Sequence, residues 1–344
     1  MDYFALEQKI TNYRKTYEVK EIGNTYFGRK IFAVERNLSN DFATAILVAS
    51  IHGRENITTD LLCEMIDNKL FENVTEFNLS FILMANPDGV ELSENGLESA
   101  PKNMHKFLFE ANDRSLDFCL WKANGNGVDL NNNFDANFGS NTTKTKPSSS
   151  GFVGEFAMSE LETQALVCYA KQRNTFFTVS YHSKGEEIYY NFFQDEKNLS
   201  RDRLIAEKFE KSTGYIIKNV ENVSSGGFKD YCVLKLKIPS ITIEVGSDNL
   251  KHPIKKEHLK EIFLRNKFIA NDIKFAYNVF NKFKWEVLWH TKKNSWKKPL
   301  YWLKKLMMLT KFRLGLLLLK MARCWHLLST GEKMDLMRLR MLKF

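Results

Sequence analysis

Cysteine is scarce in this chain of 344 residues: there are only 5, and no two are close enough to form a CxxC metal or redox motif. Their odd number and scattered positions disfavour a disulfide framework and favour a reducing compartment. The sequence also has no uncharged apolar run long enough to span a bilayer. Its opening segment alternates charged and apolar residues, which is not the pattern of a secretory signal. These absences predict a cytoplasmic protein.

Acidic residues are scarce at one end only. Residues 280–344 contain 16 lysines and arginines against three acids, a net charge of +13, so the first 279 residues carry −4 of the total of +9. A change of this size indicates two separate parts. We therefore predict a globular domain over residues 1–279 and a basic extension over residues 280–344.

The basic extension contains a stretch, residues 300–319, in which apolar residues alternate with lysines and arginines. This pattern is typical of a basic amphipathic helix, which would allow contact with an anionic membrane surface. A helix packed on the domain, a segment without selected structure and a fused or frame-shifted terminus are the alternatives. No nucleic-acid-binding module is recognisable, so nucleic acid is not an expected partner.

The first part is rich enough in apolar residues for a large core, since 44% of the whole chain is hydrophobic. Short apolar runs suited to strands covered on both faces occur at Ala43–Ile51, Leu79–Ala85, Thr175–Tyr181 and Ile238–Val245. Amphipathic helical patterns occur at Thr58–Leu70, Ser159–Arg173, Arg201–Thr213 and Lys256–Tyr277, the second with Ser159 as N-cap and Glu162 completing a capping box. This alternation predicts an α/β fold with a mixed, largely parallel twisted sheet and helices on both faces.

Residues with metal-binding chemistry follow the first of these strands. His52 and Glu55 lie in the segment Ile51-His52-Gly53-Arg54-Glu55-Asn56, where an imidazole and a carboxylate can turn toward one point. Zinc accepts such nitrogen and oxygen ligands, but needs a third one from the protein and an open position. Alone, the HxxE pattern is weak evidence, because most such pairs are surface residues without a metal.

The other strand ends carry further candidates. Asn86-Pro87-Asp88-Gly89 has the composition of a turn. His182 ends the third strand, where a histidine is often simply a hydrogen-bonded core residue. Glu244 stands inside an apolar strand, and a buried glutamate needs a partner or a function. A salt bridge would explain it, whereas desolvation would raise its pKa toward that of a general base.

One assumption about the fold brings these residues together. In open α/β sheets, ligand sites lie at the carboxyl ends of the strands, where His52, Glu55, His182 and Glu244 all fall. Three zinc ligands and a spare carboxylate are the minimum set for a hydrolytic zinc, which lowers the pKa of its water while the carboxylate takes the proton.

Six ordered blocks of sequence then become recognisable: HGRENIT (52–58), NPDG (86–89), GVDLNNNF (127–134), SYHS (180–183), SSGGFKDY (224–231) and TIEVG (242–246). In order and spacing they resemble the zinc carboxypeptidase family. The segment GNTYFGRKI (23–31) also resembles the start of that family. The resemblance covers about residues 20–250. It implies one zinc ion bound by His52, Glu55 and His182, with Glu244 as the general base and acid.

The resemblance also implies substrate-binding residues, and here the sequence departs from the family. Arg54 matches an arginine that helps to bind the substrate chain, and Asn131 an asparagine that binds its terminal carboxylate. Asn132 stands where the family has an arginine that clamps this carboxylate bidentately. Asn222 falls at the position of the family's mobile tyrosine. The clamp for an ordinary peptide C-terminus is therefore weakened.

Two lysines extend the prediction. Lys229 lies in the stretch that forms the family's side-chain pocket, where a cation would favour an acidic group on the substrate; a solvated surface lysine is the alternative. The family's oxyanion-stabilising arginine precedes the GVD block, where the nearest cations are Lys122 and, more remotely, Arg114. We assign this role to Lys122.

Together these departures resemble the bacterial γ-D-glutamyl-meso-diaminopimelate peptidase branch, which cuts cell-wall muropeptides at a γ-D-Glu linkage. The extra carboxylate of diaminopimelate would be a partner for Lys229. An ordinary carboxypeptidase that trims peptide C-termini is the second hypothesis, and an inert metal-bound binding module is the third. An acylase of the aspartoacylase type shares the HxxE pattern, but the NPDG and SGG-Lys-Asp blocks fit it poorly.

Overall fold

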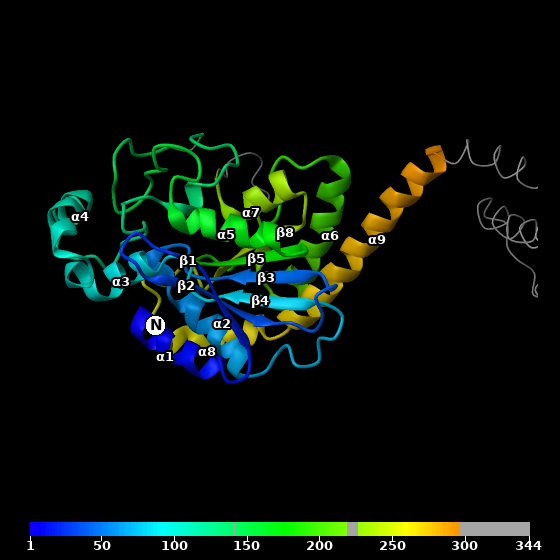
Figure 1. The fold of residues 1–344 in the computed structure, drawn as a ribbon, viewed down its shortest axis with the longest axis horizontal. Coiled ribbons are helices and arrows are strands. Elements are labelled where there is room, and N and C mark those ends of the chain that lie inside the picture. The colour runs from blue at the N-terminus through cyan, green and yellow to red at the C-terminus, as the bar shows by residue number, and fades with distance from the viewer. Residues whose placement is uncertain (141, 219–225, 296–344) are drawn as a thin grey trace, which may run out of the picture. The chain divides into compact units, whose positions relative to one another are not determined.

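Runs of β-branched and aromatic residues form one eight-stranded sheet, which lies in the compact unit Met1–Phe283 of the computed structural model. The structure describes residues 1–140, 142–218 and 226–295 (Figure 1). In spatial order the strands are β1 (Glu18–Asn24), β2 (Lys30–Arg36), β4 (Asn78–Ile82), β3 (Thr44–Val48), β5 (Thr175–Ser183), β8 (Ser240–Val245), β6 (Glu187–Tyr189) and β7 (Ile216–Ile217). The central strands β4, β3, β5 and β8 are mutually parallel, and the pairings β1–β2, β2–β4 and β8–β6 are antiparallel. The predicted mixed, largely parallel sheet is confirmed.

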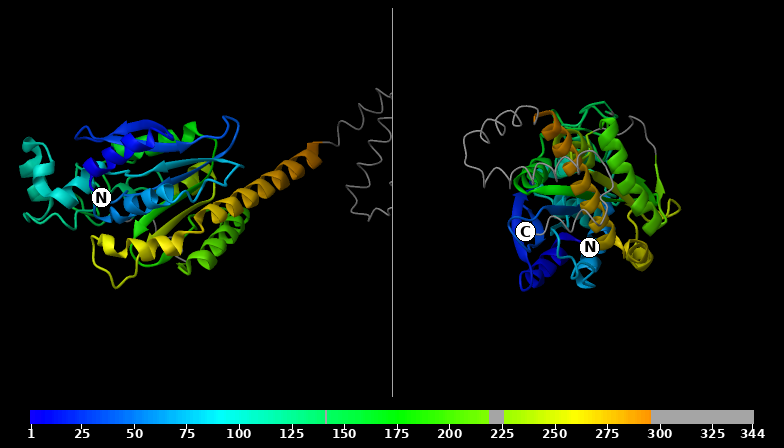
Figure 2. Two further views of the ribbon diagram at one scale, coloured as in Figure 1. Left: turned by 90° about the horizontal axis from the view of Figure 1, so that it is seen from below. Right: turned by 90° about the vertical axis from the view of Figure 1, so that its right-hand side faces the viewer.

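Both faces of the sheet are buried, because successive side chains of a strand point to opposite faces. In β3, Ala45 and Leu47 belong to one hydrophobic cluster, and Ile46 and Val48 belong to another. The first cluster includes residues of α1 (Tyr3–Tyr13), α2 (Ile57–Asp67), α6 (Glu196–Thr213), α8 (Leu259–Asn266) and α9 (Ile269–Ser295). The second includes residues of α5 (Leu161–Gln172) and α7 (Phe228–Tyr231). Figure 2 shows the twisted sheet between these helices in two further views.

A smaller cluster around Trp121 joins α3 (Pro87–Asn95) and α4 (His105–Ala111). Short helical turns complete the described elements: η1 (Gly53–Glu55), η2 (Gly96–Ser99), η3 (Lys102–Met104), η4 (Leu130–Asn132), η5 (Cys232–Leu236) and η6 (Lys256–His258). The four cysteines in the described part of the chain are all free.

Several local predictions were wrong. Ser159 does not cap α5: the cap is Glu160, whose carboxylate accepts a hydrogen bond from the Ser159 hydroxyl (Oγ–Oε1 2.7 Å). The predicted helix over 256–277 is broken into η6, α8 and α9. Near the second break the buried Asn266 donates its side-chain amide to the Ile262 carbonyl, one of the local contacts with which asparagine competes against helix continuation. The NPDG block is not a simple turn but the start of α3, with Asn86 as N-cap.

The parallel arrangement brings the expected residues to one edge. His52 follows β3, and His182 and Glu244 lie near the carboxyl ends of β5 and β8. In the β5–β8 pairing His182 is directly opposite Glu244. The sheet therefore delivers these side chains to its carboxyl-terminal edge, as expected for an open α/β sheet.

Candidate metal centre and substrate cleft

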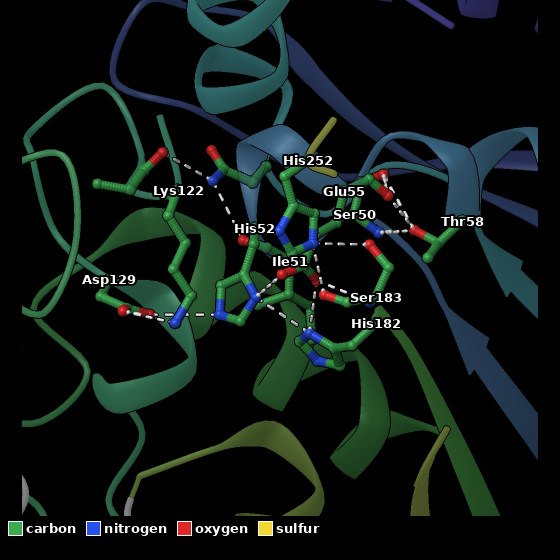
Figure 3. Close-up of polar contacts among 12 residues, drawn as sticks. Ser50, Ile51, His52, Glu55, Thr58, Lys122, Asp129, His182, Ser183 and His252 are labelled. Atoms are coloured by element: carbon green, nitrogen blue, oxygen red, sulfur yellow. Dashed lines mark hydrogen bonds and ion pairs between the residues drawn. The ribbon is translucent and has the colours of Figure 1, made fainter. Parts of the chain in front are cut away.

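Two imidazoles and one carboxylate converge at this edge of the sheet (Figure 3). His52 Nδ1 lies 2.8 Å from Glu55 Oε1, and His182 Nδ1 lies 3.0 Å from Glu55 Oε2. The two Nδ1 atoms are 3.1 Å apart, and all three side chains are buried. Within the described residues, this is the group of His, Cys, Asp and Glu side chains whose geometry suits a metal ion.

The chemistry of these donors fits zinc. Neutral imidazole nitrogens and a carboxylate are zinc ligands, and three of them from the protein leave one position open. Burial would raise the pKa of Glu55, but His52 and His182 outweigh it and hold that pKa well below its ordinary value. The carboxylate is therefore ionised, and close approach of two ring nitrogens to it and to each other is what a shared cation stabilises.

Local packing explains why the loop after β3 adopts this shape. The Gly53 amide donates to the Lys122 carbonyl (3.0 Å), and a β-carbon at Gly53 would lie 2.3 Å from the Gly89 carbonyl oxygen. The Asn86 side chain donates to the carbonyls of Ile51 and Ala123, both at 3.1 Å. The NPDG block thus holds η1 and the chain around Ala123 together, and only glycine fits at the contact.

Asp129 lies behind the first imidazole, a position that the sequence did not reveal. Its Oδ1 lies 3.3 Å from His52 Nε2, and its Oδ2 accepts a hydrogen bond from Lys122 Nζ at 3.0 Å. Despite its burial, the charges of Lys122 and His52 hold the pKa of Asp129 well below its ordinary value. A carboxylate behind a metal-binding imidazole fixes the ring and raises its basicity. The GVDLNNNF block contains this aspartate, and an acidic residue inside a recognised block is the sequence signal that could have identified it.

Glu244 lies beside the cluster, between two strands. It is paired in register with His182 on β5 and with Glu187 on β6. Burial raises the pKa of Glu244 to about 8; the negative charge of Glu55 adds to this rise, while the positive charges of His182 and Lys122 oppose it. A carboxyl group with a raised pKa next to a metal site has the properties of a proton-transfer group.

Lys122, the cation predicted to stabilise the oxyanion, lies close to the metal cluster through its contact with Asp129. Burial would lower the pKa of Lys122, but the carboxylates of Asp129 and Glu55 outweigh it, raise that pKa and keep the ammonium charged. Arg114, the more remote alternative, is exposed and has a left-handed backbone (φ 63°). The structure therefore brings Lys122 to the cluster. It gives Arg114 no comparable contact with the described residues.

Arg54, Asn131 and Asn132 are all half-buried. Arg54 has a buried Nε without a hydrogen-bond partner and forms no ion pair with the described residues. Asn131 Oδ1 accepts from the Phe228 amide (3.2 Å). The side-chain amide of Asn132 makes no hydrogen bond to the described part of the chain. These three side chains retain hydrogen-bonding capacity that the described residues leave unused.

Lys229 is not a solvated surface lysine, because only 5% of it is exposed. Its ammonium forms an ion pair with the buried Asp230, donates to the Asn191 carbonyl (3.0 Å) and lies 5.4 Å from the centre of the Phe192 ring. A substrate carboxylate would therefore have to share this ammonium with Asp230. The predicted role of Lys229 in binding an acidic group stays a prediction.

A third histidine near the cluster, His252, was not predicted from the sequence. Its Nε2 lies 3.0 Å from the Ser183 carbonyl oxygen and 3.3 Å from Ser183 Oγ, and the Ser183 amide in turn donates to Glu55 Oε2 at 3.3 Å. Figure 3 shows its ring beside the His52–Glu55–His182 cluster. No sequence block contained His252, since only the loop after β8 carries it back to this edge.

Two further predictions fall outside the described residues. Asn222, at the position of the mobile tyrosine, is one of them, and the amphipathic stretch 300–319 is the other. Among the described helices, none combines the length and the apolar character needed to cross a membrane.

Comparison with known proteins gives a consistent picture. The family model described as zinc carboxypeptidase matches residues 3–270. "Gamma-D-glutamyl-L-diamino acid endopeptidase 1" of Lysinibacillus sphaericus is 28% identical over 273 residues, 74% of this chain and 67% of that protein. Human carboxypeptidase A1 is 26% identical over 196 residues, 54% of this chain and 44% of that protein. The structure of Helicoverpa armigera carboxypeptidase A aligns with a TM-score of 0.61 at 20% identity, covering 82% of this chain and 73% of that one.

Proposed function

Because this chain belongs to the zinc carboxypeptidase family, it is a zinc metallopeptidase, and we propose that it hydrolyses cell-wall muropeptides at a γ-D-glutamyl–diaminopimelate bond. The observation that carries the enzyme assignment is the buried His52–Glu55–His182 cluster with Glu244 paired in register beside it. The cell-wall substrate is supported by the activity for which the Lysinibacillus relative is named and by the departure at Asn132.

In this proposal His52, Glu55 and His182 hold the zinc ion, and Asp129 fixes the ring of His52. When bound, zinc supplies a Lewis acid and allows water to act as a nucleophile at neutral pH. The three ligands arrive from two segments, η1 and β5, so the cluster is assembled by the fold and not by one short motif.

Glu244 carries the proton in this proposal. Its carboxylate takes a proton from the attacking water and gives it to the leaving nitrogen of the scissile amide. Its raised pKa suits both halves of this transfer, because a pKa near the working pH balances proton uptake against release. Lys122 holds a positive charge at the same edge, where it stabilises the oxygen that becomes negatively charged during attack.

Asn131 and Asn132 indicate where the carboxyl side of the substrate binds. Asn131 lies against the start of α7 and holds the carboxyl side of the substrate, with Asn132 beside it. An asparagine cannot form the bidentate contact by which arginine clamps a free carboxylate. A weak clamp suits a diamino acid whose carboxyl group continues into further peptide.

The test compares purified protein on L-Ala-γ-D-Glu-meso-diaminopimelate, on the corresponding tetrapeptide and on simple C-terminal substrates of the hippuryl type. The proposal predicts a higher kcat/KM on the γ-linked peptides. A preference for the hippuryl substrates would reject it and would favour the second candidate, a carboxypeptidase that removes C-terminal residues.

That second candidate has one observation in its favour: the Asn131 side-chain nitrogen donates to no described residue and can hold a free carboxylate. The variant Asn132→Arg separates the two. It should raise activity on simple C-terminal residues if the cell-wall assignment is right, and change little if Asn131 and Arg54 already suffice. Bound zinc without turnover of any peptide would instead indicate an inert binding module.

A further inference from the structure

His252 is a polar group beside the metal cluster that has no role in the proposed mechanism. Its imidazole is half-buried in the loop after β8, and its Nε2 is bonded to Ser183, the residue next to the ligand His182. In Figure 3 one ring nitrogen turns toward Ser183 and the other turns away from it. The ring is thus held firmly on one side and open on the other.

The Ser183 carbonyl decides which nitrogen bears the proton. A carbonyl oxygen only accepts hydrogen bonds, so His252 Nε2, 3.0 Å away, must donate. In the neutral ring Nδ1 is then an acceptor. Nδ1 makes no hydrogen bond to the described residues. It is also absent from the buried unbonded atoms of the described chain, so it is accessible to a ligand. Burial lowers the pKa of His252, which favours this neutral form.

An unpaired cation accompanies this acceptor. Arg54 has no ion-pair partner in the described chain. It directly precedes Glu55, whose Oε2 accepts from the Ser183 amide, and the Ser183 carbonyl accepts from His252, so Arg54 and His252 belong to the same edge of the sheet. At this edge the positive charge of Arg54 opposes protonation of His252 and helps to lower its pKa. This edge of the sheet therefore presents a guanidinium donor together with a neutral imidazole acceptor. A ligand that matches both carries an anionic acceptor close to an N–H donor.

A γ-linked glutamyl residue has these two groups on one carbon atom. Its α-carbon bears a free carboxylate and the N–H of the amide to the preceding residue, because its side-chain carboxyl forms the scissile bond. In an α-linked residue the same carboxyl is consumed in the scissile amide. Reading both groups at once would therefore separate γ-linked from α-linked substrates.

We infer that His252 is a specificity-determining residue. Its Nδ1 accepts a hydrogen bond from the amide N–H attached to the α-carbon of the γ-linked glutamyl residue. Arg54 pairs with the free carboxylate on the same carbon. The inference rests on the proposed function and adds the group that recognises the linkage. A carboxylate alone would need only Arg54, whereas the pair recognises the whole substituted carbon.

The variant His252→Gln separates recognition from a purely structural role. The glutamine amide can still donate to the Ser183 carbonyl, but it places no acceptor at the position of Nδ1. Zinc content and the thermal midpoint should therefore stay at wild-type values. His258→Gln is the matched control, because His258 is a partly exposed histidine whose ion-pair partner is Glu257 and not a residue of the cluster.

The experiment measures kcat/KM on L-Ala-γ-D-Glu-meso-diaminopimelate and on an analogue whose Ala–Glu amide nitrogen is methylated. One hydrogen bond corresponds to about a tenfold change. Wild type and His258→Gln should each lose about tenfold on the methylated analogue. His252→Gln should lose about tenfold on the parent peptide and nothing further on the analogue, as expected when both changes remove the same contact.

Wild-type activity of His252→Gln on the parent peptide would overturn the inference, as would losses from variant and methylation that multiply. Failure of the proposed function has a different signature. In that case the wild-type enzyme hydrolyses α-linked peptides and leaves both γ-linked peptides intact.

Discussion

The cluster His52–Glu55–His182 and the pair Lys229–Asp230 are two buried charged regions of the molecule, and they are satisfied in different ways. In the first, two ring nitrogens and two carboxylate oxygens face each other at 2.8 to 3.1 Å without a cationic side chain between them. In the second, an ammonium already neutralises the carboxylate.

This difference indicates which region suits a metal ion. Buried acceptors that face one another are stabilised by a cation from outside the chain, whereas a buried ion pair is complete without one. The charge of Lys229 is therefore already paired within the fold, whereas the charge of Glu55 is available to a metal ion.

The largest effect is expected at Glu244. Glu244→Gln keeps the shape of the side chain but removes proton transfer, so kcat should fall by at least about a hundredfold. Bound zinc, measured by metal analysis, should stay at the wild-type level because Glu244 is not a ligand in this proposal. Unchanged activity would refute the mechanism, and loss of zinc would place Glu244 among the ligands.

Breaking the ion pair tests the other side of the comparison. Lys229→Met leaves the Asp230 carboxylate buried without its ammonium, and the free energy of unfolding should fall by about 3 kcal/mol. Urea unfolding measures it. A stable variant that loses selectivity for acidic substrates would instead show that Lys229 serves the substrate.

Asp129 links the metal cluster to Lys122, and its effect should be smaller. Asp129→Asn removes the charge behind His52, so zinc affinity should weaken by about 10- to 100-fold. Competition with a chelator gives the affinity. Asp135→Asn is the control, because Asp135 forms an exposed ion pair with Lys235 and should leave zinc binding unchanged.

The smallest effect concerns Glu162, a buried carboxyl with neither metal nor cation. Burial raises its pKa from 4.5 to about 8. The folded state then binds the proton more tightly than the unfolded state, so this group's contribution to stability is full below pH 4.5 and is lost as the pH rises toward 8.

Glu162→Gln should abolish this loss, so the thermal midpoint of the variant should fall less than that of wild type between about pH 5 and pH 8, the range over which the contribution is lost. Glu160→Gln is the contrasting variant. Glu160 accepts hydrogen bonds from Ser159, Asn124 and Asn126, so its replacement should destabilise the protein at every pH. Equal pH dependence in wild type and Glu162→Gln would remove Glu162 as the titrating group.

The sequence by itself determined the α/β class, the central parallel strands and the convergence of His52, Glu55 and His182, and it placed Glu244 at the end of a neighbouring strand. These follow from local information, because short apolar runs specify buried strands and chemically reactive residues stand directly at their ends. Helix boundaries were less accurate, since the α5 cap and the break after Asn266 depend on side-chain contacts that periodicity does not contain.

Only the tertiary structure decided which charges are paired. Lys229 and Arg54 are both cations of the predicted cleft, yet one is bound to Asp230 and the other has no partner in the described chain. Asp129 and His252 reach the cluster through loops that return from distant segments. Pairing and burial depend on distances across the fold, and these distances are set by packing between segments that the sequence order keeps far apart.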